Sequence, residues 1–202
     1  MHGANLTYDI LTKSRNPSAI ESLTAGLCDS DSQTRTRSLR TLVARSDTRS
    51  CEVILKHWNE LDCDLIDPRT VQQRPMAEAV ETALREDGDM VLAAIDAAER
   101  FQLFTTIPKL ILLAESHANE VVKKRAGDAV LQLVEPLGQH ARFRRDRTMI
   151  RGPVMSRLVD SMERFSSHGN EVLVEAFLVA SAWGDHELRR FIDQRGPIAD
   201  LV

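Results

Sequence analysis

The chain repeats one helix pattern four times, and this recurrence constrains its fold more than any other feature. Each copy has an apolar or small residue, a second one five positions later and a third three positions after that. The four copies are Thr34, Leu39 and Leu42; Met90, Ile95 and Ala98; Val121, Ala126 and Ala129; Val172, Phe177 and Ala180. Each copy follows a short polar segment, the first of which is Asp29-Ser30-Asp31-Ser32. A recurring helix start with an apolar stripe behind it is typical of a helical repeat array.

The composition agrees with an all-α fold built from aliphatic side chains. Of the 202 residues, 43% are hydrophobic but only 4% are aromatic, so the core depends on Leu, Ile, Val and Ala. Apolar residues recur at helical spacing along most of the chain, and nowhere do β-branched residues alternate with polar ones as in a strand. The sequence therefore predicts about eleven helices in a single repeat domain spanning residues 1–202.

The copies are unevenly spaced, at 56, 31 and 51 residues. This irregularity predicts insertions near residues 46–74 and 139–152. Pro136 and Gly138 are expected to end one helix, and Gly152-Pro153 is expected to begin the next. Gly127 falls inside a predicted helix, where glycine costs about 1 kcal/mol relative to alanine. Its presence there predicts a close approach by a neighbouring helix.

Two segments, residues 19–23 and 120–130, resemble HEAT repeats of the HEAT/armadillo superfamily. In such a repeat, Asp31 and Asn119 would cap second helices, while Arg35 and Arg125 match the family's arginine only approximately. The resemblance covers most of the chain. It implies an irregular right-handed αα solenoid of roughly five helix pairs, with a concave surface lined by the second helices.

Charge is distributed unevenly along the chain. The net charge is −4, but residues 51–100 alone carry 5 basic and 12 acidic side chains, a balance of −7. One basic set is interpreted as a single solvated face, and it comprises Arg35, Arg37, Arg40, Arg45 and Arg49. The densest basic segment lies between two predicted helices and comprises Arg142, Arg144, Arg145, Arg147 and Arg151. Guanidinium groups bind phosphates and carboxylates, so these five are the candidate site for an anionic partner. The alternative is a solvated connection whose arginines pair with nearby acidic groups.

No motif predicts catalysis, a metal or a cofactor. Cys28, Cys51 and Cys63 form no CxxC pair and are interpreted as reduced thiols of a cytoplasmic protein. His57 lies near Asp62, Cys63 and Asp64 in the sequence, but at no recognised metal-ligand spacing. Two HEAT-like enzyme classes are relevant by resemblance. The single pair His186-Glu187 is too few for a di-iron hydroxylase, and Trp183, Asp185 and Arg189 offer only a weak match to a DNA glycosylase groove.

The sequence therefore predicts a non-enzymatic scaffold that binds a protein partner through a helical-repeat surface. The alternative is a nucleic-acid-binding protein that uses residues 142–151. No signal peptide is recognised, and no apolar run is long enough to span a membrane. The pattern favours no particular oligomeric state.

Overall fold

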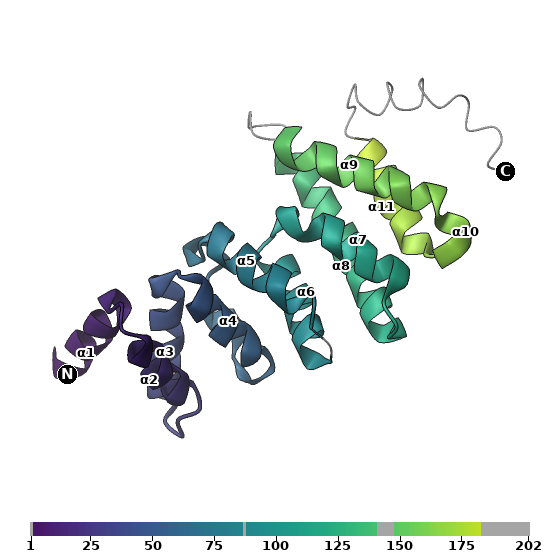
Figure 1. The fold of residues 1–202 in the computed structure, drawn as a ribbon. Coiled ribbons are helices and arrows are strands. Elements are labelled where there is room, and N and C mark those ends of the chain that lie inside the picture. The colour runs from purple at the N-terminus through teal and green to yellow at the C-terminus, as the bar shows by residue number, and fades with distance from the viewer. Residues whose placement is uncertain (1, 87, 141–147, 183–202) are drawn as a thin grey trace. The chain divides into compact units, whose positions relative to one another are not determined.

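The computed structural model describes residues 2–86, 88–140 and 148–182 (Figure 1). In these residues the chain forms eleven α-helices and four short 3-10 helices, and no strand occurs among them. The all-α prediction is confirmed for this part of the chain. The chain divides into two compact units, residues 1–101 and 102–202. The prediction of one domain across the whole chain stays a prediction.

The first unit contains six α-helices, with three 3-10 helices between the fourth and the fifth. The α-helices are α1 (His2–Lys13), α2 (Pro17–Leu27), α3 (Ser32–Arg45), α4 (Thr48–Lys56), α5 (Gln73–Ala83) and α6 (Asp89–Arg100). The 3-10 helices are η1 (Trp58–Glu60), η2 (Cys63–Leu65) and η3 (Pro68–Thr70). Helix α3 packs on α1, α2 and α4, while α4 also packs on α2, α5 and α6. Helices α2 to α6 thus bury their apolar stripes against neighbours in the sequence, whereas Leu6 and Ile10 of α1 stay exposed.

Within the segment predicted to be an insertion, residues 46–74, the chain forms helix α4 and then the three 3-10 helices that lead to α5. Asp47 begins that helix, where its carboxylate accepts the Ser50 N–H at 2.9 Å. The irregular part, residues 57–72, is fixed by its own apolar side chains: Ile66 and Val71 are buried. Trp58 is also buried and meets the Phe101 ring edge-on, with the centroids 5.7 Å apart. This insertion is therefore part of the core of the first unit.

The second unit is built from two stacked helix pairs. Its elements are η4 (Phe104–Thr106), α7 (Ile107–Ser116), α8 (Glu120–His140), α9 (Thr148–Glu163), α10 (Phe165–His168) and α11 (Glu171–Ser181). Helix α7 packs on α8 and α9 packs on α11; across the pairs, α7 packs on α9 and α8 on α11. The first helices of the two pairs, α7 and α9, thus pack on each other, and so do the second helices, α8 and α11.

One capping device begins both second helices of this unit. The His117 Nδ1 accepts the Asn119 N–H at 3.0 Å, and the Asn119 side chain accepts the Val121 N–H at 2.8 Å. The same pair of bonds recurs at His168 and Asn170, at 3.0 and 3.1 Å. The capping role expected for Asn119 is confirmed.

Close helix approach at glycine is confirmed for Gly127 of α8. A Cβ atom built there would lie 3.3 Å from the Asn170 Nδ2 and 3.6 Å from the Val172 Cβ, both at the start of α11. The Asn170 amide also donates to the Ala114 carbonyl of α7 at 3.1 Å. Gly127 thus leaves room for the cap that joins the two helix pairs.

The predicted end of α8 and the predicted start of α9 were wrong. Helix α8 continues through Pro136 to His140, and α9 begins at Thr148, ahead of Gly152 and Pro153. The aliphatic stripe explains the continuation, since Val134 and Leu137 on either side of Pro136 are both buried. Packing of this stripe outweighs the hydrogen bond that the proline cannot make. No helix in the described ranges has the length and apolar character needed to cross a bilayer.

Candidate functional site

The arginine-rich segment falls mostly outside the described residues. This holds for Arg142, Arg144, Arg145 and Arg147. Arg151 lies in the first turn of α9, where the sequence had predicted a loop. Its Nη2 donates to the Gly138 carbonyl of α8 at 3.1 Å. The described end of the segment therefore joins α9 to α8.

The basic set of Arg35, Arg37, Arg40, Arg45 and Arg49 is not one solvated face, because the Arg45 side chain is largely covered. Its side chain is only 7% exposed. The Nη1 atom donates to two carbonyls at the end of α1, that of Leu11 at 2.6 Å and that of Ser14 at 2.7 Å. The Nε atom donates to Asp47 at 3.1 Å and to the Ser50 hydroxyl at 3.2 Å. Arg45 thus fastens α1 to the junction of α3 and α4.

Arg35 also has a structural role. Its Nη1 donates to the carbonyls of Asp29 and Ser30 at 2.7 and 2.9 Å, in the turn before α3. Arg40 and Arg49 are exposed, on α3 and α4 respectively. Only part of the set therefore fits the interpretation as a solvated face.

Two neighbouring depressions flank α4 in the first unit, and both include Glu52. The first, of about 300 Å³, lies between α2 and α4. Its lining residues are Pro17, Ile20, Glu21, Thr24, Arg49, Glu52, Val53 and Lys56. The second, of about 250 Å³, lies among α4, α5 and the start of α6. Its lining residues are Glu52, Leu55, Ala79, Thr82, Ala83, Glu86 and Met90.

The second depression has an apolar floor and an acidic rim. Leu55, Ala79 and Ala83 are buried, so their side chains form the floor. Glu52 and Glu86 are both exposed at the rim, with no basic residue in the lining. This depression can take an apolar side chain while attracting positive charge beside it.

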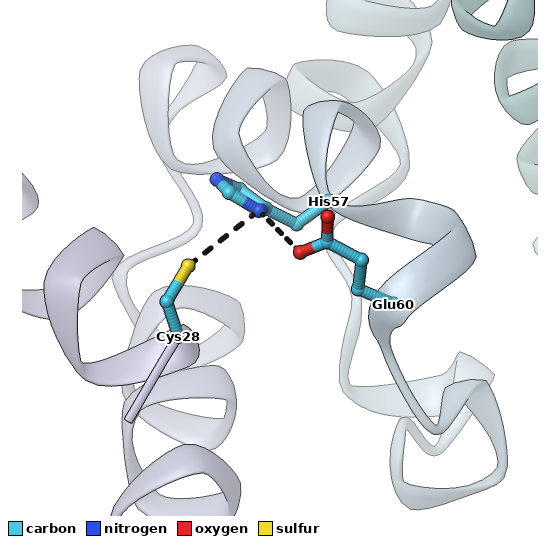
Figure 2. Close-up of side chains that lie close together, drawn as sticks. All are labelled: Cys28, His57 and Glu60. Atoms are coloured by element: carbon cyan, nitrogen blue, oxygen red, sulfur yellow. Dashed lines mark hydrogen bonds and ion pairs between the residues drawn. The ribbon is translucent and has the colours of Figure 1, made fainter. Parts of the chain in front are cut away.

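A separate cluster joins the ends of two helices: Cys28, His57 and Glu60 (Figure 2). Cys28 is the C-terminal cap of α2, and His57 is the C-terminal cap of α4. Glu60 follows in η1, the turn that the buried Trp58 fixes in place. The Cys28 Sγ lies 3.9 Å from the His57 Nδ1, and the Glu60 Oε2 lies 3.0 Å from the same nitrogen.

The Cys28 sulfur and the Glu60 oxygen approach the same imidazole nitrogen of His57, and this decides which chemistry the cluster can perform. A nucleophilic triad places the nucleophile and the carboxylate on different imidazole nitrogens, so that one nitrogen takes the proton while the other is held. Here sulfur and oxygen both approach Nδ1, as Figure 2 shows. The arrangement therefore cannot work as such a triad. It does bring a sulfur, a nitrogen and an oxygen within 4.8 Å of one another.

The residues that lie near His57 in the sequence, Asp62, Cys63 and Asp64, have other partners. The Cys63 Sγ faces the carbonyls of Trp58 and Leu61. Asp62 caps η2 by accepting the Asp64 N–H, and the Asp64 carboxylate accepts from Arg100 at 3.3 Å. Burial raises the pKa of the Cys63 thiol above its ordinary value.

The candidate residues for a glycosylase or a di-iron enzyme lie outside the described residues; they are Trp183, Asp185, His186, Glu187 and Arg189. Trp58, the other tryptophan, is 6% exposed and packs on Phe101, so it cannot stack on a nucleic-acid base.

Comparisons of the chain with protein-family models, with curated proteins and with solved structures find no match.

Sequence reasoning missed Cys28 and Glu60 as neighbours of His57. Cys28 precedes His57 by 29 residues, so only the packing of α2 on α4 brings them together. One signal was available: Cys28 directly follows an apolar helical stripe that ends in Leu27, and His57 lies two residues after a stripe that ends in Leu55. Two such ends meet at one edge wherever consecutive first helices of a repeat array run side by side.

Proposed function

We propose that the chain is a non-enzymatic scaffold of the HEAT-like, stacked-pair type that binds a protein segment. Support for the repeat class comes from the second unit, where first helices pack on first helices and second on second. The recurring His-x-Asn cap supports it as well. A stack of this kind presents long helix surfaces on which other chains can lie.

The observation that carries the proposal is the depression with an apolar floor between Glu52 and Glu86. Its floor residues come from two helices, Leu55 from α4 and Ala79 and Ala83 from α5. An apolar side chain placed there would leave water, at about 25 cal/mol per Å² of apolar surface buried. The two carboxylates at the rim favour lysine or arginine next to that side chain.

The partner that fits is a peptide segment with an apolar anchor flanked by basic residues. The shared position of Glu52 allows the segment to continue from this depression into the one between α2 and α4. The depression between α2 and α4 includes Arg49 and Lys56 as well as Glu21. Its mixed charge favours a polar or acidic residue farther along the same segment.

Selection from a library of displayed random peptides, against the full chain, tests the proposal. We expect selected peptides to share an apolar residue flanked by Lys or Arg. The double variant Glu52→Lys with Glu86→Lys should weaken their binding about tenfold or more, a change of about 1.4 kcal/mol, in fluorescence anisotropy. Asp9→Lys, on the exposed side of α1, makes the same kind of charge change away from both depressions and should leave affinity unchanged.

The proposal is contradicted if the selected peptides bind the double variant and the parent chain with the same affinity. The nucleic-acid alternative gives a different result. Binding of single-stranded DNA or RNA would weaken steeply with salt, regardless of sequence, and would be lost when Arg142, Arg144, Arg145 and Arg147 are replaced by Ala.

A further inference from the structure

The Cys28, His57 and Glu60 cluster offers one ligand atom of each type that late transition metals prefer. These atoms are a thiol sulfur, an imidazole nitrogen and a carboxylate oxygen, all within 4.8 Å of one another. Zn²⁺ is bound in proteins by this combination of Cys, His and acidic ligands. We propose that Cys28, His57 and Glu60 bind a zinc ion. The proposal is independent of the peptide-binding function.

The distances suit a small tetrahedral ion. Zinc–ligand bonds of about 2.0 to 2.3 Å at tetrahedral angles separate neighbouring ligand atoms by about 3.4 to 3.6 Å. The observed separations are 3.9 Å between the Cys28 Sγ and the His57 Nδ1, and 3.0 Å from that nitrogen to the Glu60 Oε2. Both therefore lie within about 0.5 Å of the required values, while the sulfur and the carboxylate oxygen lie within 4.8 Å of each other, so binding draws Glu60 toward Cys28. The Glu60 side chain, 71% exposed, is free to make the remaining adjustment.

The backbone supports a cation at this place. Cys28 and His57 each cap the C-terminus of a helix, α2 and α4. A helix C-terminus carries a partial negative charge of about half an elementary charge. Two such ends next to the cluster favour a positive ion there.

The ligands are held to different degrees. The His57 side chain is 16% exposed, and Trp58 beside it is buried, so the imidazole has a fixed position. Cys28 and Glu60 are exposed, and this leaves a side of the site open to solvent. Three protein ligands then hold the ion and water completes its coordination.

Binding requires a defined change of protons. The Cys28 thiol gives up its proton to the solvent as the sulfur–zinc bond forms. In a neutral ring that donates from Nδ1 to Glu60, this proton moves through the solvent to Nε2, which leaves the Nδ1 lone pair to bind the ion. The hydrogen bond between Nδ1 and Glu60 is then replaced by two bonds to the ion.

A bound ion would fasten α2 to the turn after α4. Cys28 belongs to the end of α2, while His57 and Glu60 belong to the end of α4 and to η1. Zinc therefore stabilises the packing of consecutive helix pairs in the first unit, since it binds the folded arrangement and not the unfolded chain.

Cobalt provides a direct measurement on the full, tag-free chain, reduced and freed of metal with a chelator. Co²⁺ should produce a thiolate-to-cobalt absorption band with a stoichiometry of one, and added Zn²⁺ should abolish it. Zn²⁺ should also protect Cys28 from alkylation and raise the thermal unfolding midpoint. Cys28→Ser should remove the band and weaken zinc binding by at least about 100-fold, and Glu60→Gln should weaken it on the order of tenfold.

Cys63→Ser is the matched control, because Cys63 is the nearby thiol that faces Trp58 and Leu61 instead of the cluster. It should keep the band, the protection of Cys28 and the rise in midpoint. Absence of a thiolate band in the parent chain would overturn the proposal, and so would a band that persists in Cys28→Ser or disappears in Cys63→Ser. The cluster would then be a hydrogen-bonded His57–Glu60 pair beside an unrelated thiol.

Discussion

Replacing Arg45 by Met should detach α1 from the rest of the first unit. The guanidinium is the group that bridges the last carbonyls of α1 to the start of α4, at 2.6 and 2.7 Å on one side and 3.1 and 3.2 Å on the other. Methionine keeps most of the aliphatic stem, so the packing of that stem is retained. The variant therefore isolates the four polar contacts.

The size of the effect follows from which groups lose a partner. Hydrogen bonds that involve a charged group contribute about 1.5 to 3 kcal/mol each. Asp47 keeps two contacts of its own, from the Ser50 N–H and hydroxyl at 2.9 and 3.0 Å, so it is not left without a partner. The two carbonyls of α1 do lose the arginine. Water reaches them when α1 lifts, and this limits the net loss to about 2 to 4 kcal/mol.

Two measurements check this estimate. Urea unfolding, with Trp183 replaced by Phe so that Trp58 is the only tryptophan, reports the free energy of the first unit. Hydrogen exchange of residues 2–13 reports whether α1 opens locally. Arg40→Met, on the exposed side of the same helix, should change the free energy by less than about 0.5 kcal/mol. If Arg45→Met behaves like this control in both measurements, the bridging role is refuted.

Two further predictions concern the same unit. Gly26→Ala places a Cβ atom 2.2 Å from the Ser38 Oγ, so we expect a loss of up to about 2 kcal/mol in urea unfolding, since overpacking costs about 1 to 3 kcal/mol and the gain in helix propensity returns about 1. Adding Ser38→Ala should recover at least about 1 kcal/mol, and strictly additive free energies would contradict the contact. Burial raises the pKa of the Cys51 thiol from 9.0 to about 12. The native chain thus retains a proton that the unfolded chain releases from about pH 9 upward, so native stability should be unchanged below about pH 9 and should fall from there to about pH 12. That fall should be smaller in Cys51→Ala; an equal fall in both proteins would show that this thiol is not its source.

The starts of α2, α3, α6, α8 and α11 were predicted well because their signals are local. Asn16 followed by Pro17 begins α2, with the Asn16 side chain accepting the Ser18 N–H at 3.0 Å. The four copies of the sequence pattern all begin within the first three residues of a helix, those of α3, α6, α8 and α11. A capping side chain and the N–H groups that it accepts lie within three residues, so a single segment contains the whole interaction.

Helix ends and distant neighbours were predicted poorly because they depend on packing. Pro136 is an ordinary stop signal, yet buried aliphatic residues on both sides of it keep α8 helical. Helix α1 was not predicted, since its exposed Leu6 and Ile10 do not follow the repeat pattern and Arg45 fixes it from α3. The cluster of Cys28 with His57 depends on two helices lying side by side, which no local pattern in the sequence encodes.

The two His-x-Asn caps of the second unit differ in how far they depend on the chain before them. The bonds of the His117 cap reach only two positions along the chain, so the start of α8 is set within its own segment. The second cap has the same local bonds, but His168 is also bonded to Ser161 of α9, and Asn170 donates to Ala114 of α7. Residues inserted before His117 should therefore disturb the inward-facing side chains of the next helix less than residues inserted between Ser161 and His168.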